Sequence, residues 1–86
     1  MPEDKKHSME IIGKTIVSKS GKKFGLVGDL VFETRTGELI YLLLDNATEF
    51  AGTLNLEKAR DGGLLVPFSS VISVGDFVII SEDEII

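Results

Sequence analysis

Residues suited to acid–base, nucleophilic or metal chemistry are few in this chain of 86 residues, and their spacing does not favour any such chemistry. The chain has no cysteine and one histidine, His7, so it lacks the ligands of a tetrahedral Cys/His zinc site. His7 lies in a charged N-terminal segment, where no Ser-His-Asp or His-metal arrangement can be built around it. We therefore expect a non-enzymatic protein with no catalytic residue, no metal site and no cofactor.

Two short motifs resemble ligand-binding sequences without meeting their requirements. Gly21-Lys22 is similar to the end of a phosphate-binding loop, but Ile16 stands where the loop's first glycine is needed and Lys23 replaces the Ser/Thr. The run 82–84 is acidic, yet adjacent side chains diverge and the spaced calcium ligands of an EF-hand are missing. Neither motif predicts a bound ligand.

Charge is divided unevenly along the chain. Residues 1–23 carry six lysines and three acidic residues, whereas residues 24–86 carry three basic and eleven acidic residues, which gives +3 and −8. Candidates for RNA binding lie at the basic end: Lys14, Lys19, Lys22 and Lys23. No aromatic residues alternate with these lysines to stack bases, and the remainder is acidic. We expect a protein partner, with RNA or ribosome-associated binding as the alternative.

Length and hydropathy predict one small domain in the cytoplasm. A chain of this size has room for a single core. The N-terminal charges are followed by no apolar stretch of the kind that a secretory signal needs. The longest apolar run, residues 39–44, is far short of the roughly 20 residues that cross a bilayer as a helix. We expect no direct insertion into a membrane.

The apolar residues occur in short blocks separated by Gly, Ser, Asp and Asn, which indicates strands and turns. Strands are predicted at residues 14–18, 24–34, 38–45, 63–67, 71–74 and 77–81. Gly25 and Gly28 lie inside the second strand, where glycines mark the bulges that curl a sheet. The predicted fold class is all-β, a small barrel of about six short antiparallel strands. In residues 46–62 we expect no strand and one helical turn capped by Asn55.

The third strand has two apolar faces, since its odd and even positions are both apolar from 39 to 44. One face fills a barrel, so the other needs cover, either from residues 46–62 or from a second protein. We predict a homodimer, or a heterodimer with a related barrel, with the Tyr41 face outward. The predicted interface residues are Leu39, Tyr41, Leu43, Val27 and Val31, together with Ile85 and Ile86 from the C-terminal tail.

Domain boundaries follow from the same pattern. We expect a disordered leader at residues 1–9, a barrel at 10–81 and an acidic-aliphatic tail at 82–86. Ile85 and Ile86 either extend the last strand over the barrel edge or dock on a partner. Phe68 and Phe77 are predicted core residues, because large aromatic side chains dominate the cores of small domains.

The sequence resembles the PRC-barrel domain over about residues 10–81. The resemblance rests on the order of short motifs, namely Ile12-Gly13-Lys14, Gly21, Phe24-Gly25-x-Val27-x-Asp29-Leu30-Val31, Thr36-Gly37, Leu65-Val66-Pro67-Phe68-x-x-Val71 and Val74-Gly75-Asp76-Phe77-Val78-Ile79-Ile80. The sequence is most similar to the short stand-alone archaeal members. The family also includes the cytoplasmic domain of the reaction-centre H subunit and the C-terminal domain of RimM.

The resemblance implies a role for the chain. Some archaeal members act in cell division and bind SepF, the membrane anchor of FtsZ. The resemblance therefore implies an adaptor that binds a SepF-like cell-division protein, a paralogous PRC barrel, or both, and that is recruited to the division site through its partner. The similarity to RimM implies the alternative, an RNA- or ribosome-associated binding module.

Overall fold

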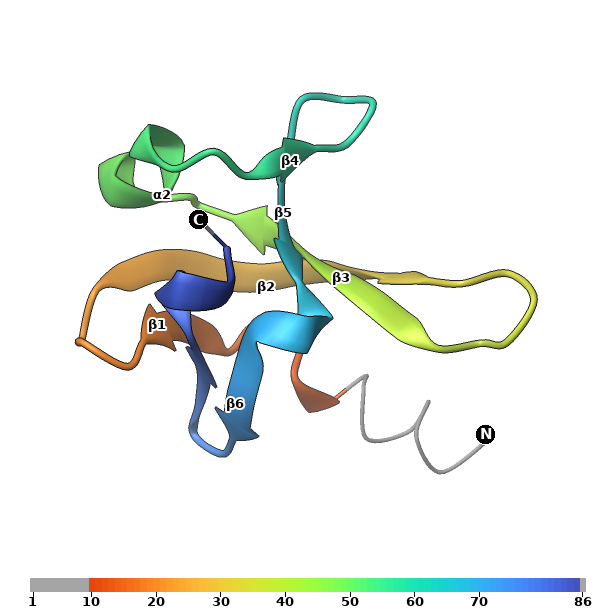
Figure 1. Ribbon diagram of the computed structural model, residues 1–86, viewed down its shortest axis with the longest axis horizontal. Helices are drawn as coiled ribbons and strands as arrows, with labels where there is room; N and C mark the ends of the chain where they lie inside the picture. The colour runs from red at the N-terminus through yellow and green to blue at the C-terminus, as the bar shows by residue number, and fades with distance from the viewer. Residues whose placement is uncertain (1–9, 86) are drawn as a thin grey trace.

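Seven β-strands form one sheet in the computed structural model, which describes residues 10–85 (Figure 1). The strand order across the sheet is β4-β5-β3-β2-β1-β7-β6. The strands are β1 (Thr15–Ser18), β2 (Lys23–Phe32), β3 (Leu39–Asp45), β4 (Glu57–Lys58), β5 (Leu64–Pro67), β6 (Val71–Val74) and β7 (Phe77–Ile80). The predicted leader at residues 1–9 and Ile86 lie outside the described residues.

The predicted all-β class is confirmed, and two details of the pairing differ. A further two-residue strand, β4, pairs with β5. Strands β1 and β7 run parallel to each other, with Ile16 opposite Val78, whereas the other neighbouring strands are antiparallel. The expectation of antiparallel strands throughout was wrong here, because the pairing partner of β1 depends on where the C-terminal hairpin packs.

Strand β2 bends at the two glycines that the sequence singles out. The register between β2 and β3 shifts between Val27 and Asp29, which places Gly28 at the irregularity. Gly25 has a φ of +146°, and a Cβ added there would lie 2.9 Å from the backbone oxygen of Asp45. Only glycine permits this approach of two strands. The bends curl the sheet so that one face encloses the core.

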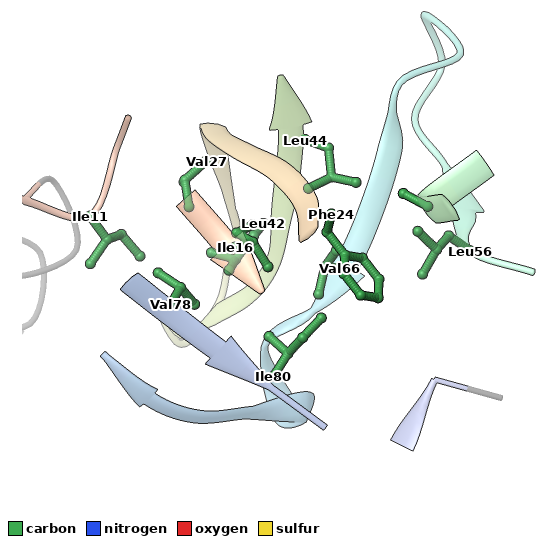
Figure 2. Close-up of a cluster of buried hydrophobic side chains, with 11 residues drawn as sticks. Ile11, Ile16, Phe24, Val27, Leu42, Leu44, Leu56, Val66, Val78 and Ile80 are labelled. Carbon is green, nitrogen blue, oxygen red and sulfur yellow. The ribbon is translucent and has the colours of Figure 1, made fainter. Parts of the chain in front are cut away.

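The core lies inside the curled sheet and draws on most of its strands (Figure 2). Phe24 is fully buried, and its ring packs edge-on against Phe50 with centroids 5.5 Å apart. The fully buried aliphatic side chains around it are Ile16, Val27, Leu42, Val66, Val78 and Ile80. The core is thus aliphatic packing around one aromatic ring.

Residues 46–62 form a short helix, α2 (Glu49–Thr53), followed by β4. The Thr48 hydroxyl caps this helix by accepting a hydrogen bond from the Ala51 N–H at 3.2 Å, and it donates one to the Lys23 carbonyl at 2.6 Å. The predicted helical turn capped by Asn55 was wrong. Leu56 is buried and β4 begins at the next residue, so burial of Leu56 outweighs local helix propensity there.

Two 3-10 turns complete the fold, η1 (Phe68–Ser70) between β5 and β6 and η2 (Glu82–Glu84) after β7.

The two predicted core aromatics differ in their surroundings. Phe68 packs against the core, whereas Phe77 is 53% exposed, so its prediction was wrong. Phe77 is at the start of β7, where its side chain projects away from the buried Val78. No helix within residues 10–85 is long and apolar enough to cross a membrane.

Candidate protein-binding surface

The two edges of the sheet differ in length and charge. Strand β4, at one edge, consists of Glu57 and Lys58. Strand β6, at the other edge, has four residues and no charged side chain. Edge strands expose unpaired backbone groups, and short length and charge protect them from pairing with another chain. By these two criteria, and within residues 10–85, β4 is protected and β6 is open.

Apolar side chains are exposed on the same hairpin. Ile72 is 55% exposed, Val74 47% and Phe77 53%. These three residues, called the hairpin patch below, all lie on the β6–β7 hairpin, at the bottom of Figure 1. The Lys14 ammonium donates a hydrogen bond to the Gly75 carbonyl in the turn, which ties the hairpin to the segment before β1. Val74 lies opposite the buried Val78, so its side chain is on the other face of the hairpin from Phe77. Exposed apolar residues on one element are typical of interaction sites.

The sequence analysis did not place an interface at this hairpin. A usable signal was present, because residues 71–74 contain no charge although 27% of the chain is charged. The signal was missed because Phe77 was assigned to the core. Strand β6 was also read without knowing that it lies at an edge, which is set by the order of strands in the sheet.

The interface residues predicted on β2 and β3 occupy different environments. Val27 is 1% exposed and belongs to the core, so no partner can reach it in this fold. Leu39 packs against the core as well. Tyr41 and Leu43 are half-buried, and Val31 is half-buried opposite Tyr41 on the neighbouring strand. Leu42 and Leu44 alternate with Tyr41 and Leu43 along β3 and point into the core.

The loop after β3 covers part of the outer side of Tyr41 and Leu43. The Tyr41 hydroxyl donates a hydrogen bond of 3.1 Å to the Glu57 carboxylate. The Leu43 side chain lies against Gly63, where an added Cβ would come within 2.8 Å of Leu43 Cδ1. Residues 57–63 therefore supply some of the cover that a second protein was expected to give.

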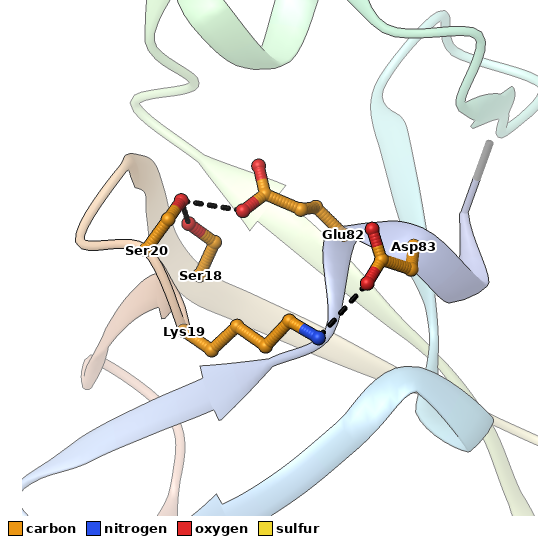
Figure 3. A network of polar contacts seen from close by, with 5 residues as sticks. All are labelled: Ser18, Lys19, Ser20, Glu82 and Asp83. Carbon is orange, nitrogen blue, oxygen red and sulfur yellow. Dashed lines mark hydrogen bonds and ion pairs between the residues drawn. The ribbon is translucent and has the colours of Figure 1, made fainter.

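The tail folds back onto the barrel. Ile85 packs against the core, and β7 ends at Ile80, so the tail does not extend the last strand. Two polar contacts hold η2 to the β1–β2 turn (Figure 3): the Ser20 hydroxyl donates to the Glu82 carboxylate, and Lys19 Nζ lies 2.8 Å from Asp83 Oδ2. Ile86 lies outside the described residues.

The lysines of the basic end are largely engaged within the chain. The hydrogen bond and charge of Asp83 raise the pKa of Lys19, and Glu82 and Glu84 add to this effect. Lys14 bonds to the Gly75 carbonyl, and the Lys22 ammonium lies 5.8 Å from the centre of the Phe50 ring. This end of the domain is therefore less of a free basic patch than the sequence indicates.

Acidic residues line an open hollow of about 490 Å³ beside Leu43 and Gly63, among them Asp29, Asp45 and Asp61. Asp29 accepts a hydrogen bond from the Leu30 N–H, and Asp61 accepts one from the Gly63 N–H. Within residues 10–85, no group of three or more His, Cys, Asp or Glu side chains is placed to hold a metal ion. Asp61 thus supports a turn, and Asp29 a backbone N–H within β2.

A small curled sheet with one open edge and an exposed apolar hairpin defines a binding domain. The model of the PRC-barrel domain family matches residues 3–85, so the chain belongs to this family of non-catalytic binding domains. The resemblance seen in the sequence is thereby confirmed. The chain is also 29% identical to "Uncharacterized protein MJ1118" of Methanocaldococcus jannaschii over 69 residues, which cover 80% of this chain and 73% of that protein.

Proposed function

We propose that this chain is a non-enzymatic adaptor that binds another protein through the hairpin patch. The observation that supports this proposal is the exposure of Ile72, Val74 and Phe77 beside the open edge of β6. Each of these side chains has about half of its surface left to bury, which is worth about 1 kcal/mol apiece. A partner that buries two of them gains about 2 kcal/mol, or roughly thirtyfold in affinity.

The proposed partners are those that the family resemblance implies, a SepF-like cell-division protein or a related PRC barrel. Two observations support them: the family membership over residues 3–85 and the similarity to a protein of an archaeon. In this role the chain is cytoplasmic and reaches the division site through its partner. An adaptor of this kind needs surfaces and no catalytic group.

RNA binding is the second candidate, and the contacts of its lysines argue against it. Lys19 is paired with Asp83, and Lys14 is bonded to the turn at Gly75. Strong phosphate binding depends on several free cations acting together. A nucleic-acid partner would have to displace these contacts and approach a chain with a net charge of −5.

The proposal is tested by calorimetric titration of the full chain with a purified SepF-like protein and with a purified paralogous PRC barrel. We expect Ile72→Ser to weaken binding at least tenfold. The matched control is Ile40→Ser, since Ile40 is exposed on β3 away from the hairpin. We expect this control to bind like the wild type. Equal loss in both variants, or no loss in either, would contradict the proposal.

Salt dependence separates the two candidate functions. A complex held by the hairpin patch should change little in affinity between about 50 and about 500 mM salt, whereas RNA binding should fall steeply over that range. The affinity for RNA is measured in the same way for the wild type and for Lys23→Met. Tight, salt-sensitive RNA binding that is lost in Lys23→Met would favour the RNA alternative.

A further inference from the structure

We infer that a small pocket between β3, β5 and the C-terminal tail binds an arginine side chain of another protein. The pocket has a volume of about 220 Å³, and the residues that line it include Tyr41, Leu56, Glu57, Pro67 and Glu84. No residue of the hairpin patch lines it. The inference therefore goes beyond the proposed function and stands independently of it.

The size and the walls of the pocket limit what it can hold. Its volume is below the about 300 to 1,000 Å³ of small-molecule sites, so it has room for about one side chain. The buried Leu56 and the half-buried Pro67 supply apolar walls. Tyr41 adds an aromatic ring. A long basic side chain suits such walls, because its apolar stem packs on them and aromatic rings attract its cationic head.

Two carboxylates make the pocket acidic. Glu57 comes from β4 and Glu84 from η2, so elements distant in sequence place both in one pocket. Glu57 accepts a hydrogen bond from the neutral Tyr41 phenol, which leaves its negative charge uncompensated. Within residues 10–85, no lysine or arginine forms an ion pair with Glu57 or Glu84. A cation supplied by a partner would compensate both charges.

The packing of the tail leaves Glu84 available for a partner. The two preceding carboxylates contact the β1–β2 turn, Glu82 through Ser20 and Asp83 through Lys19. The charge of Glu84 contributes to the raised pKa of Lys19, but the Lys19 ammonium gives its hydrogen bond to Asp83. The tail is thus fixed by its other acidic residues, and Glu84 is the one that lines the pocket.

Arginine fits this arrangement better than lysine does. A guanidinium group has five N–H donors in one plane, so it can donate to two carboxylates at once and stack on an aromatic ring. An ammonium group is a compact point charge without this fork. Residues 24–86 carry three basic and eleven acidic residues, so the surroundings also attract a cation. For a single side chain we expect a dissociation constant of roughly 1 to 10 mM.

The fluorescence of Tyr41 tests the inference on the full chain, because Tyr41 is the single tyrosine and tryptophan is absent. The probe is a blocked tripeptide with arginine between two glycines, added to about 30 mM at constant ionic strength. We expect a saturable change in the tyrosine signal. The same peptide with citrulline, which has a similar shape and no charge, should cause none.

Matched variants locate the site. We expect Glu84→Gln and Glu57→Gln each to weaken binding of the arginine peptide roughly tenfold, because each removes one charge-assisted hydrogen bond. Glu38→Gln removes the same charge from the β2–β3 turn and should bind like the wild type. Thermal unfolding of all three variants shows that each is folded. Equal affinity in the three variants would overturn the assignment to this pocket.

The ionisation of Tyr41 gives a second readout. Arginine keeps its charge up to a pH of about 12, so it remains a cation while the phenol titrates. A cation in the pocket favours the phenolate, so the saturating arginine peptide should lower the pKa of Tyr41, whereas the citrulline peptide should not. Ultraviolet absorbance measures both titrations.

Three further outcomes would overturn the inference. The first is a tyrosine signal that does not change up to about 30 mM arginine peptide. The second is equal binding of the citrulline peptide, which would show that the charge is not recognised. The third is a lysine peptide that binds as tightly as the arginine peptide, which would contradict the choice of arginine. None of these outcomes bears on the hairpin patch, whose test uses Ile72→Ser.

Discussion

Tyr41 and Glu57 join the outer side of β3 to the short edge strand β4 through a hydrogen bond of 3.1 Å from the phenol to the carboxylate. The two residues are separated by residues 42–56, which include the helix α2. This contact fixes the return of the chain from α2 to the sheet. Strands β4 and β3 do not pair directly, because β5 lies between them in the sheet.

Ionisation of Tyr41 should report this contact. The pKa of Tyr41 lies above the ordinary 10.0, first because the phenol donates to Glu57, then because the nearby negative charge disfavours a phenolate, and last because of burial. Tyr41 is the single tyrosine and the chain has no tryptophan, so ultraviolet absorbance follows this phenol alone. We expect its titration midpoint above 10.0 in the wild type and a lower midpoint in Glu57→Gln.

The same shift predicts how stability depends on pH. Because the folded pKa of Tyr41 is raised, its contribution is fully present below the unfolded value of 10.0 and is lost as the pH rises through the folded pKa. Denaturant unfolding should therefore show a smaller difference in the free energy of unfolding between wild type and Glu57→Gln at a pH above the folded pKa of Tyr41 than at a pH below 10.0. Identical titration midpoints in the two proteins would show that the contact does not form in solution.

Gly25 and Gly37 make a matched pair for testing backbone strain. Both have a positive φ, but a Cβ at Gly25 would lie 2.9 Å from the Asp45 backbone oxygen, whereas at Gly37 nothing lies within 4 Å. We expect Gly37→Ala to cost about 1 kcal/mol from conformation alone. Gly25→Ala should cost roughly 3 kcal/mol, since β2 and β3 must also move apart. Urea unfolding measures both, and equal losses would argue against the close approach.

Packing of the tail is tested at Ile85. This side chain contacts the core, so we expect Ile85→Ala to lower the free energy of unfolding by about 1 to 2 kcal/mol. Asp83→Asn is the control, because the ion pair with Lys19 is exposed and such pairs contribute little. Truncation after Ser81 should destabilise at least as much as Ile85→Ala. If truncation removes partner binding and leaves stability unchanged, the tail is a recognition element instead.

Phe24, which is buried, and Phe77, which is half-exposed, should respond differently to substitution. Phe24 is fully buried, so Phe24→Leu should cost about 1 to 2 kcal/mol and lower the melting temperature by about 5 to 15 °C. Phe77 is half-exposed on the hairpin, so Phe77→Ser should change the melting temperature by only a few degrees. Calorimetry compares the two variants. A large loss in Phe77→Ser would return this residue to the core.

Most of the strands were predictable because their signals are local. Residues 71–74 were predicted as a strand with the bounds that β6 has, and the predicted strands at 14–18, 38–45, 63–67 and 77–81 each differ from the observed ones by a single residue at one end. Gly28 also marks a break in register. Strand β4 was not predictable, since two residues such as Glu57 and Lys58 carry no alternation and become a strand by lying next to β5.

The residues of the candidate binding surface were harder to predict from the sequence than the strands. A doubly apolar strand such as β3 signals that both faces are covered, but it does not say by what. Residues 57–63, with Glu57 on Tyr41 and Gly63 on Leu43, supply part of that cover. Phe77 illustrates the opposite case, since a large aromatic residue in a strand predicts burial until its place in the sheet is known.

The sequence by itself determined the all-β class, the family and the position of most strands, because alternating apolar residues, glycines and turn residues act over a few neighbours. The tertiary structure decided which strands lie at the edges, where Ile85 packs, and which lysines are paired. It also separated the buried Val27 from the exposed Ile72. These features depend on contacts such as Lys19 with Asp83, whose partners are 64 positions apart. No local pattern encodes such contacts, because they form only when the whole sheet curls around its core.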